Sequence, residues 1–126
     1  MKTFDLTKQY RLFKKDIEKR ILEVLSSGSY ILGENVKSFE NNASRYLSTR
    51  YTVSCNSGTD ALVMSLRALN IGQNDQVITS PFTYFATSEA ISLVGATPIF
   101  ADINPHTFNI NPKKIEKFIS KKTKAV

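Results

Sequence analysis

The sequence has little of what marks secreted, metal-binding or fibrous proteins. It contains one cysteine, Cys55, which excludes an internal disulfide, and nothing in it resembles the cysteine spacing of a structural zinc site. Five glycines and four prolines are too few for a collagen-like or low-complexity chain. These absences predict an ordinary globular protein of a reducing compartment.

Long apolar runs are missing as well. The N-terminus reads Met-Lys-Thr-Phe-Asp-Leu and lacks the apolar core of a signal peptide. No stretch approaches the roughly 18 apolar residues that a membrane-spanning helix needs. We therefore expect a soluble, cytoplasmic protein without a membrane partner.

Positive charge is in excess, and most of the excess lies near the C-terminal end. The 126 residues carry a formal net charge of +6. Residues 112–126 contain one acid, Glu116, and six lysines: Lys113, Lys114, Lys117, Lys121, Lys122 and Lys124. This run could be a nucleic-acid arm. However, Ile115, Phe118 and Ile119 recur at helical spacing between the lysines, which is typical of an amphipathic helix with a solvated face and an inward apolar face. We expect no nucleic-acid partner.

Two amphipathic helices are predicted before residue 50. Apolar residues recur at spacings of three and four over Tyr10–Leu25, and Ser26-Ser27-Gly28 provides a stop signal. A second run, over 36–46, repeats this spacing. A short connection, Ser29 to Gly33, separates the two.

After residue 50, short β-rich segments alternate with helical ones, which predicts an α/β fold with right-handed crossovers and a parallel sheet. Strands are expected over Tyr51–Cys55, Gln76–Ser80 and Thr97–Ala101, and helices over Thr59–Leu69, Ala86–Val94 and 111–119. The last residues, Thr123–Val126, look like the start of another strand. We therefore expect 1–126 to be a single incomplete segment of a larger protein, with N-terminal helices over 1–50 and the start of the sheet over 51–126.

The turn Asn56-Ser57-Gly58-Thr59 is the first candidate site. It follows a predicted strand and opens a helix, and helix N-termini at the carboxyl ends of parallel strands bind anions. Gly58 permits close approach of the backbone, and Ser57 and Thr59 add hydroxyl donors. The same residues could simply cap the helix, and Asp60 opposes a bound anion unless its carboxylate points away. Both interpretations stay open on the sequence.

A second candidate is the aromatic segment after the strand at Gln76–Ser80. Phe82, Tyr84 and Phe85 lie close together at a strand end, where a flat ring can stack on a planar heterocycle. Tyr84 is our candidate for that role. Alternatively, all three rings pack beneath their own loop.

These segments resemble the pyridoxal-phosphate-dependent sugar-nucleotide aminotransferases of the DegT/StrS type, in order and spacing over nearly the whole chain. The segments that carry the resemblance are Phe4-Asp5-Leu6, Gln9-Tyr10, Ser27 to Gly33, Ser57-Gly58-Thr59-Asp60-Ala61-Leu62, Gln76-Val77-Ile78, Pro81 to Thr87, Gly95-Ala96-Thr97-Pro98, Asp102-Ile103 and Lys122 to Val126.

The resemblance implies a fold-type I enzyme. Its large domain would have a mostly parallel seven-stranded sheet, followed by a smaller C-terminal domain, with active sites at a homodimer interface. The reaction would move an amino group from an amino acid, typically glutamate, to a nucleotide-linked keto sugar, as in polysaccharide biosynthesis. By position, Ser57, Gly58 and Thr59 would hold the phosphate of pyridoxal 5'-phosphate and Tyr84 would stack on its ring. Tyr30 and Gly33 would lie near the substrate mouth.

The same resemblance implies that the Schiff-base lysine and the acid that pairs with the ring nitrogen lie beyond Val126. The lysines present here are expected on the surface, and Asp102 is expected to cap the next turn. His106 is expected in an exposed loop, and Cys55 as a small packed side chain. We thus expect an N-terminal fragment that is inactive alone. The alternative is a freestanding α/β module that binds a phosphate or nucleotide.

Overall fold

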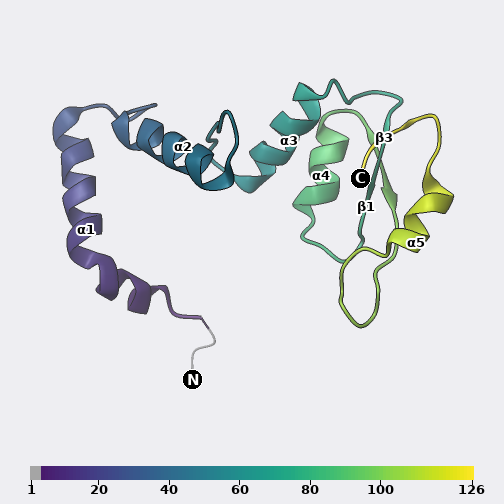
Figure 1. The fold of residues 1–126 in the computed structure, drawn as a ribbon, viewed down its shortest axis with the longest axis horizontal. Coiled ribbons are helices and arrows are strands. Elements are labelled where there is room, and N and C mark those ends of the chain that lie inside the picture. The colour runs from purple at the N-terminus through teal and green to yellow at the C-terminus, as the bar shows by residue number, and fades with distance from the viewer. Residues whose placement is uncertain (1–3) are drawn as a thin grey trace. The chain divides into compact units, whose positions relative to one another are not determined.

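The computed structural model describes residues 4–126, which divide after Ser54 into two compact units (Figure 1). We call them the helical unit (up to Ser54) and the sheet unit (Cys55–Val126). In chain order the elements are α1 (Leu6–Ser27), α2 (Glu34–Leu47), α3 (Gly58–Ala68), β1 (Gln76–Thr79), α4 (Ala86–Leu93), β2 (Thr97–Phe100), α5 (Pro112–Ile115), the 3-10 turn η1 (Glu116–Phe118) and β3 (Thr123–Ala125). No helix of the described residues is long and apolar enough to cross a membrane.

In the helical unit, α1 begins and ends at residues whose local chemistry favours a helix terminus. The Asp5 side chain caps α1 by accepting a hydrogen bond from the Thr7 N–H at 3.0 Å. Gly28, at φ +68°, ends α1 in the left-handed conformation that glycine favours. The two helices predicted over Tyr10–Leu25 and 36–46 are therefore confirmed, with α1 and α2 each slightly longer than predicted.

The strand predicted over Tyr51–Cys55 is wrong. No residue of 51–55 pairs with a strand among residues 4–126, because polar groups of this segment bind α2 instead. The Glu40 carboxylate accepts hydrogen bonds from the Ser54 N–H at 2.8 Å and from the Ser54 hydroxyl at 2.7 Å. The Ser44 hydroxyl donates to the Thr52 hydroxyl at 2.9 Å.

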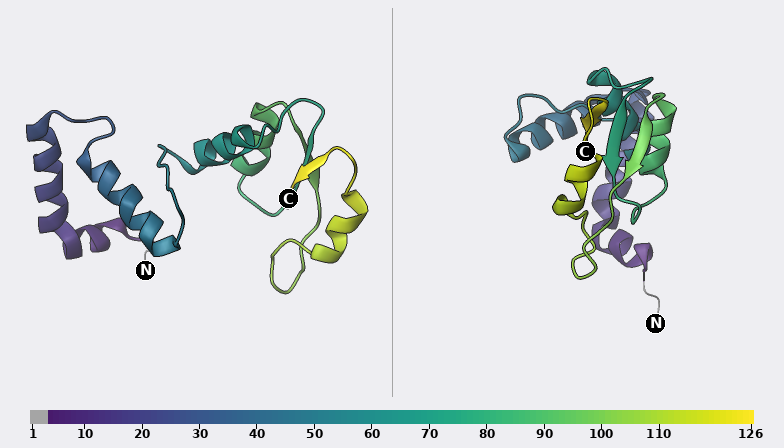
Figure 2. Two further views of the ribbon diagram at one scale, coloured as in Figure 1. Left: turned by 45° about the horizontal axis from the view of Figure 1, so that its top comes forward. Right: turned by 90° about the vertical axis from the view of Figure 1, so that its right-hand side faces the viewer.

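The sheet unit contains a three-stranded parallel sheet in the order β2-β1-β3. Ile78 pairs with Ile99 in β2, and Gln76 pairs with Thr123 in β3. Figures 1 and 2 show α4 on one face of the sheet and α5 on the other, which is the arrangement that two right-handed crossovers in opposite directions produce. The predicted α/β class and parallel sheet are confirmed. The residues expected to begin another strand form the third strand, β3 (Thr123–Ala125).

The buried core of the sheet unit is small. The core is a cluster formed by Ile71, Val77, Ile91 and Ala96, and Leu66 of α3 and Ala125 of β3 pack against it.

The helix predicted over 111–119 is shorter than expected. Pro112 opens α5 behind the Asn111 cap, but regular helix gives way to η1 after one turn. Ile115 is half-buried, whereas Phe118 and Ile119 are exposed, so the inward face predicted there is wrong for the latter two.

Candidate functional site

The first turn of α3 is organised by Ser57 and Asp60. Ser57 is the N-cap: its hydroxyl oxygen accepts a hydrogen bond from the Asp60 N–H at 3.1 Å. The same hydroxyl donates to the Asp60 carboxylate at 2.8 Å. The capping interpretation of Ser57 is therefore confirmed. A cap alone does not exclude a ligand, because capping uses only part of the donor set of a helix N-terminus.

Several donors remain free at this turn. Within the described residues, the backbone N–H groups of Gly58 and Thr59 and the Thr59 hydroxyl make no hydrogen bond to the protein. A Cβ on Gly58 would meet nothing within 4 Å, so the space beside this backbone is open. Free amides at the positive end of a helix dipole suit a phosphate group. The donor set therefore fits the phosphate of pyridoxal phosphate.

Tyr84 lies on the loop between β1 and α4 and is 82% exposed. Phe85 is exposed too, whereas the Phe82 ring lies 5.4 Å from the ring of Phe108, at an interplanar angle of 31°. The alternative that all three rings pack under the loop is wrong for Tyr84 and Phe85. No hydrogen bond in the described part of the chain links Tyr84 to the turn at Ser57–Thr59.

Tyr30 and Gly33 lie in the helical unit, in the connection from α1 to α2. They line a cavity of about 330 Å³ together with polar side chains that include Arg20, Glu23 and Asn35. The Tyr30 hydroxyl donates to the Leu25 carbonyl at 3.3 Å. A Cβ on Gly33 would lie 2.8 Å from the Ser29 carbonyl oxygen, so this turn requires glycine.

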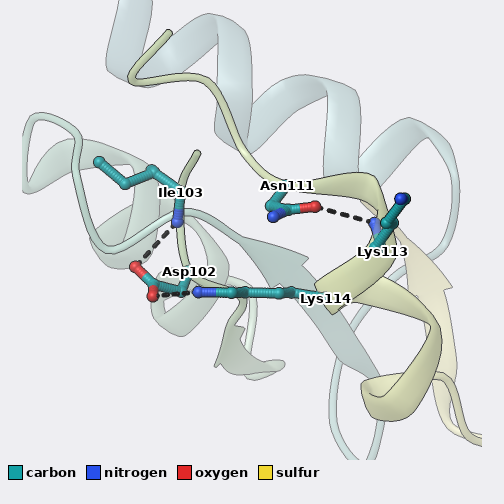
Figure 3. A network of polar contacts seen from close by, with 5 residues as sticks. All are labelled: Asp102, Ile103, Asn111, Lys113 and Lys114. Carbon is teal, nitrogen blue, oxygen red and sulfur yellow. Dashed lines mark hydrogen bonds and ion pairs between the residues drawn. The ribbon is translucent and has the colours of Figure 1, made fainter. Parts of the chain in front are cut away.

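Asp102 lies two residues after β2 and contacts Ile103 and Lys114 (Figure 3). Its carboxylate accepts hydrogen bonds from the Ile103 N–H at 2.8 Å and from the Lys114 ammonium at 2.5 Å. The Lys114 hydrogen bond, followed by that from Ile103, lowers the pKa of Asp102 below its ordinary value. The turn at 105–107 is capped by Asn104, whose side-chain oxygen accepts from the His106 N–H at 2.9 Å, so the prediction that Asp102 caps it is wrong. The ion pair of Asp102 with Lys114 ties α5 to the segment that follows β2.

The remaining predicted side chains lie at the surface. Among residues 4–126, every lysine except the half-buried Lys114 is exposed, while Lys2 lies outside the described residues. His106 is exposed, as expected. Cys55 is exposed as well, so its predicted packing is wrong; its thiol lies 3.3 Å from the Ser57 carbonyl oxygen, to which it donates. No group of His, Cys, Asp or Glu that could hold a metal occurs in residues 4–126.

The contact that sequence reasoning missed is the pairing of Asp60 with Ser57. The spacing Ser-x-x-Asp at a helix start is close to the capping-box pattern and could have indicated it. Glu40 was also missed, because its contact with Ser54 spans 14 residues and no local pattern encodes it.

Comparison with known proteins decides the family. A model of the DegT/DnrJ/EryC1/StrS aminotransferase family matches residues 12–126. The chain belongs to this family. One relative, the UDP-2-acetamido-2-deoxy-3-oxo-D-glucuronate aminotransferase of Pseudomonas aeruginosa, is 42% identical over 97% of this chain and 34% of its own length. The chain thus spans about a third of the length of the curated relatives it matches.

Solved structures agree with this assignment. The S. venezuelae DesV structure in complex with a ketimine intermediate matches with a TM-score of 0.92 and 37% identity, over 95% of this chain and 32% of that one. The NtdA structure from Bacillus subtilis, with bound cofactor PMP, matches with a TM-score of 0.84 and 41% identity, over 87% and 25%. The fold of this chain is therefore that of part of an aminotransferase of fold type I.

Proposed function

We propose that residues 1–126 form an incomplete segment of the large domain of a pyridoxal-phosphate-dependent sugar aminotransferase, and that the turn at Ser57–Thr59 anchors the cofactor phosphate. The observation that carries this proposal is the free donor set of α3, namely the amides of Gly58 and Thr59 and the Thr59 hydroxyl. Membership of the family supports pyridoxal phosphate as the ligand. The NtdA structure, which contains PMP, supports the same cofactor class.

Each residue would contribute binding and orientation. The amides of Gly58 and Thr59 would donate to phosphate oxygens, and the Thr59 hydroxyl would add a charge-assisted hydrogen bond. Tyr84, exposed on the loop between β1 and α4, would orient the pyridine ring by stacking. When bound, pyridoxal phosphate supplies the electron sink for amino transfer. In this proposal, residues 1–126 anchor and orient the cofactor and transfer no proton.

The substrates and partners are further proposals. The named reaction of the Pseudomonas aeruginosa relative, on a UDP-linked oxo sugar, supports a nucleotide-linked keto sugar as acceptor, with an amino acid such as glutamate as donor. Tyr30 and Gly33, at the cavity of the helical unit, would contribute to the substrate mouth. The complete protein would be a cytoplasmic homodimer. Within residues 1–126, we propose that 1–50 form the N-terminal helices and that 51–126 form the start of the sheet of the large domain.

The test uses pyridoxine 5'-phosphate, which has no aldehyde and so cannot react with the surface lysines. We expect Thr59→Ala to weaken binding about tenfold or more, since a hydrogen bond to a charged group contributes roughly 1.5–3 kcal/mol. Thr107→Ala removes a hydroxyl from an exposed loop of the same unit and is the matched control. Isothermal titration measures both affinities.

Two results would contradict the proposal. Equal affinity in the wild type and Thr59→Ala would show that the Thr59 hydroxyl does not hold the phosphate. Binding of a nucleotide in preference to the cofactor analogue would instead favour the freestanding phosphate-binding module, which the family match does not favour. Unphosphorylated pyridoxine, tested in parallel, should bind far more weakly because it lacks the dianion.

A further inference from the structure

The hydroxyl of Ser57 has one proton, and that proton is already engaged. It points to the Asp60 carboxylate at 2.8 Å, while the oxygen accepts the Asp60 N–H at 3.1 Å. A hydroxyl donates one hydrogen bond at a time. Ser57 therefore cannot donate to a phosphate oxygen until its hydrogen bond to Asp60 breaks. Thr59 has no such competitor among the described residues.

The charge of Asp60 acts in the same direction. Asp60 is the acidic residue of the first turn of α3 and is half-buried. The positive end of the helix dipole favours any anion placed there, whether a carboxylate or a phosphate. A carboxylate that already occupies this field reduces what a second anion gains, and like charges a few ångströms apart repel.

We propose that Asp60 is an affinity-determining residue, an internal anion that competes with the cofactor phosphate for the Ser57 hydroxyl and for the helix terminus. This inference rests on the phosphate site proposed above. It assigns different roles to two neighbouring hydroxyls. The Thr59 hydroxyl can donate to the phosphate at once. The Ser57 hydroxyl can donate to it only after its hydrogen bond to Asp60 breaks.

The competition predicts opposite changes in affinity and stability. Asp60→Asn removes the charge but keeps the size of the side chain. It should bind inorganic phosphate about fivefold more tightly, the factor for one unit charge about 4 Å away in water. The same change weakens the favourable interaction of an acid with the start of α3, so the melting temperature should fall slightly. A residue with a purely structural role would lower both.

The experiment follows the amide resonances of Gly58 and Thr59 in the whole chain during titration with inorganic phosphate. Glu116→Gln is the matched control, because it removes one negative charge from η1 of the same unit. Ser57→Ala isolates the hydrogen bond. In that background, Asp60→Asn should give a smaller gain than in the wild type, because only the charge is left to remove.

Tighter phosphate binding in Asp60→Asn, with Glu116→Gln unchanged, supports the proposal. Unchanged or weaker binding in Asp60→Asn, with clear shifts at Gly58 and Thr59 in the wild type, overturns the competition but leaves the phosphate site intact. Absence of shifts at Gly58 and Thr59 in every variant overturns the phosphate site itself, and the competition with it. Should Asp60→Asn lose its fold, Asp60→Ser provides the same comparison.

Discussion

The helical unit and the sheet unit differ in what they bury. Neither α1 nor α2 contains a buried residue, although both are amphipathic; Leu12, for example, is 75% exposed. In the sheet unit, Ile78 is 1% exposed and Ala90 is fully buried. The same kind of apolar periodicity therefore produces helices in both units but a core only where strands provide a second layer.

Local signals can therefore define a helix without stabilising a domain. α1 has the Asp5 cap, the Gly28 stop and i,i+4 ion pairs such as Lys14–Glu18. Such contacts contribute only tenths of a kcal/mol each, and most helical stability in proteins comes from packing. We expect the sheet unit to be the more stable of the two.

Core truncation should show the largest contrast. Ile78→Ala should lower the free energy of unfolding of the sheet unit by about 2–5 kcal/mol, because it opens a cavity beside β1. Leu12→Ala, in α1, should change stability by no more than about 0.5 kcal/mol. Urea titration followed by resonances of each unit measures both. Similar costs for the two variants would mean that the apolar face of α1 is covered in solution.

Two glycines provide the next contrast. Gly33→Ala places a Cβ 2.8 Å from the Ser29 carbonyl oxygen and should cost about 1–3 kcal/mol, as overpacking does. Gly58→Ala meets no protein atom and has no positive φ, so its stability should be unchanged or slightly higher. Thermal melts monitored by circular dichroism compare them. A destabilised Gly58→Ala variant would contradict the open space described beside α3.

The aromatic loop predicts a smaller effect on binding. Tyr84→Ala should weaken binding of pyridoxine 5'-phosphate about two- to tenfold, since an aromatic pair contributes roughly 0.5–1.5 kcal/mol beyond burial. Binding of inorganic phosphate should not change. Phe85→Ala serves as control, because Phe85 is 72% exposed and directly follows Tyr84. If Tyr84→Ala weakened the binding of both ligands equally, Tyr84 would affect the phosphate site at Ser57–Thr59 and would not stack on the pyridine ring.

Acid should produce the smallest effects, one in each unit. Hydrogen bonds from Ser54 lower the pKa of Glu40, and Lys114 does so for Asp102. Each interaction contributes stability above the ordinary carboxyl pKa, 4.5 for Glu40 and 3.8 for Asp102, and that contribution is lost as the pH falls through the lowered value. Carboxyl carbon shifts recorded against pH should therefore give midpoints below those ordinary values. Midpoints at or above them would contradict these contacts.

Sequence patterns predicted those parts of the fold that depend on local chemistry. Gly28 ends α1 and Asn111 caps α5 because caps are encoded within a few residues. Residues 51–55 were mispredicted because β-propensity identifies a strand only when a partner strand is available. At the candidate site, the cap at Ser57 followed from residue type. The engagement of its proton by Asp60 did not, because hydrogen-bond direction depends on side-chain geometry.

The anion site at the start of α3 is tested most directly by titrating the whole chain with inorganic phosphate and following each backbone amide resonance. Saturable shifts should be largest at the Gly58 and Thr59 amides. High salt should reduce these shifts less than it reduces shifts caused by attraction to exposed surface charges, because the backbone N–H groups bind the phosphate directly. Shifts spread over the lysine-rich residues 112–126 instead, with Gly58 and Thr59 unmoved, would contradict the anion site.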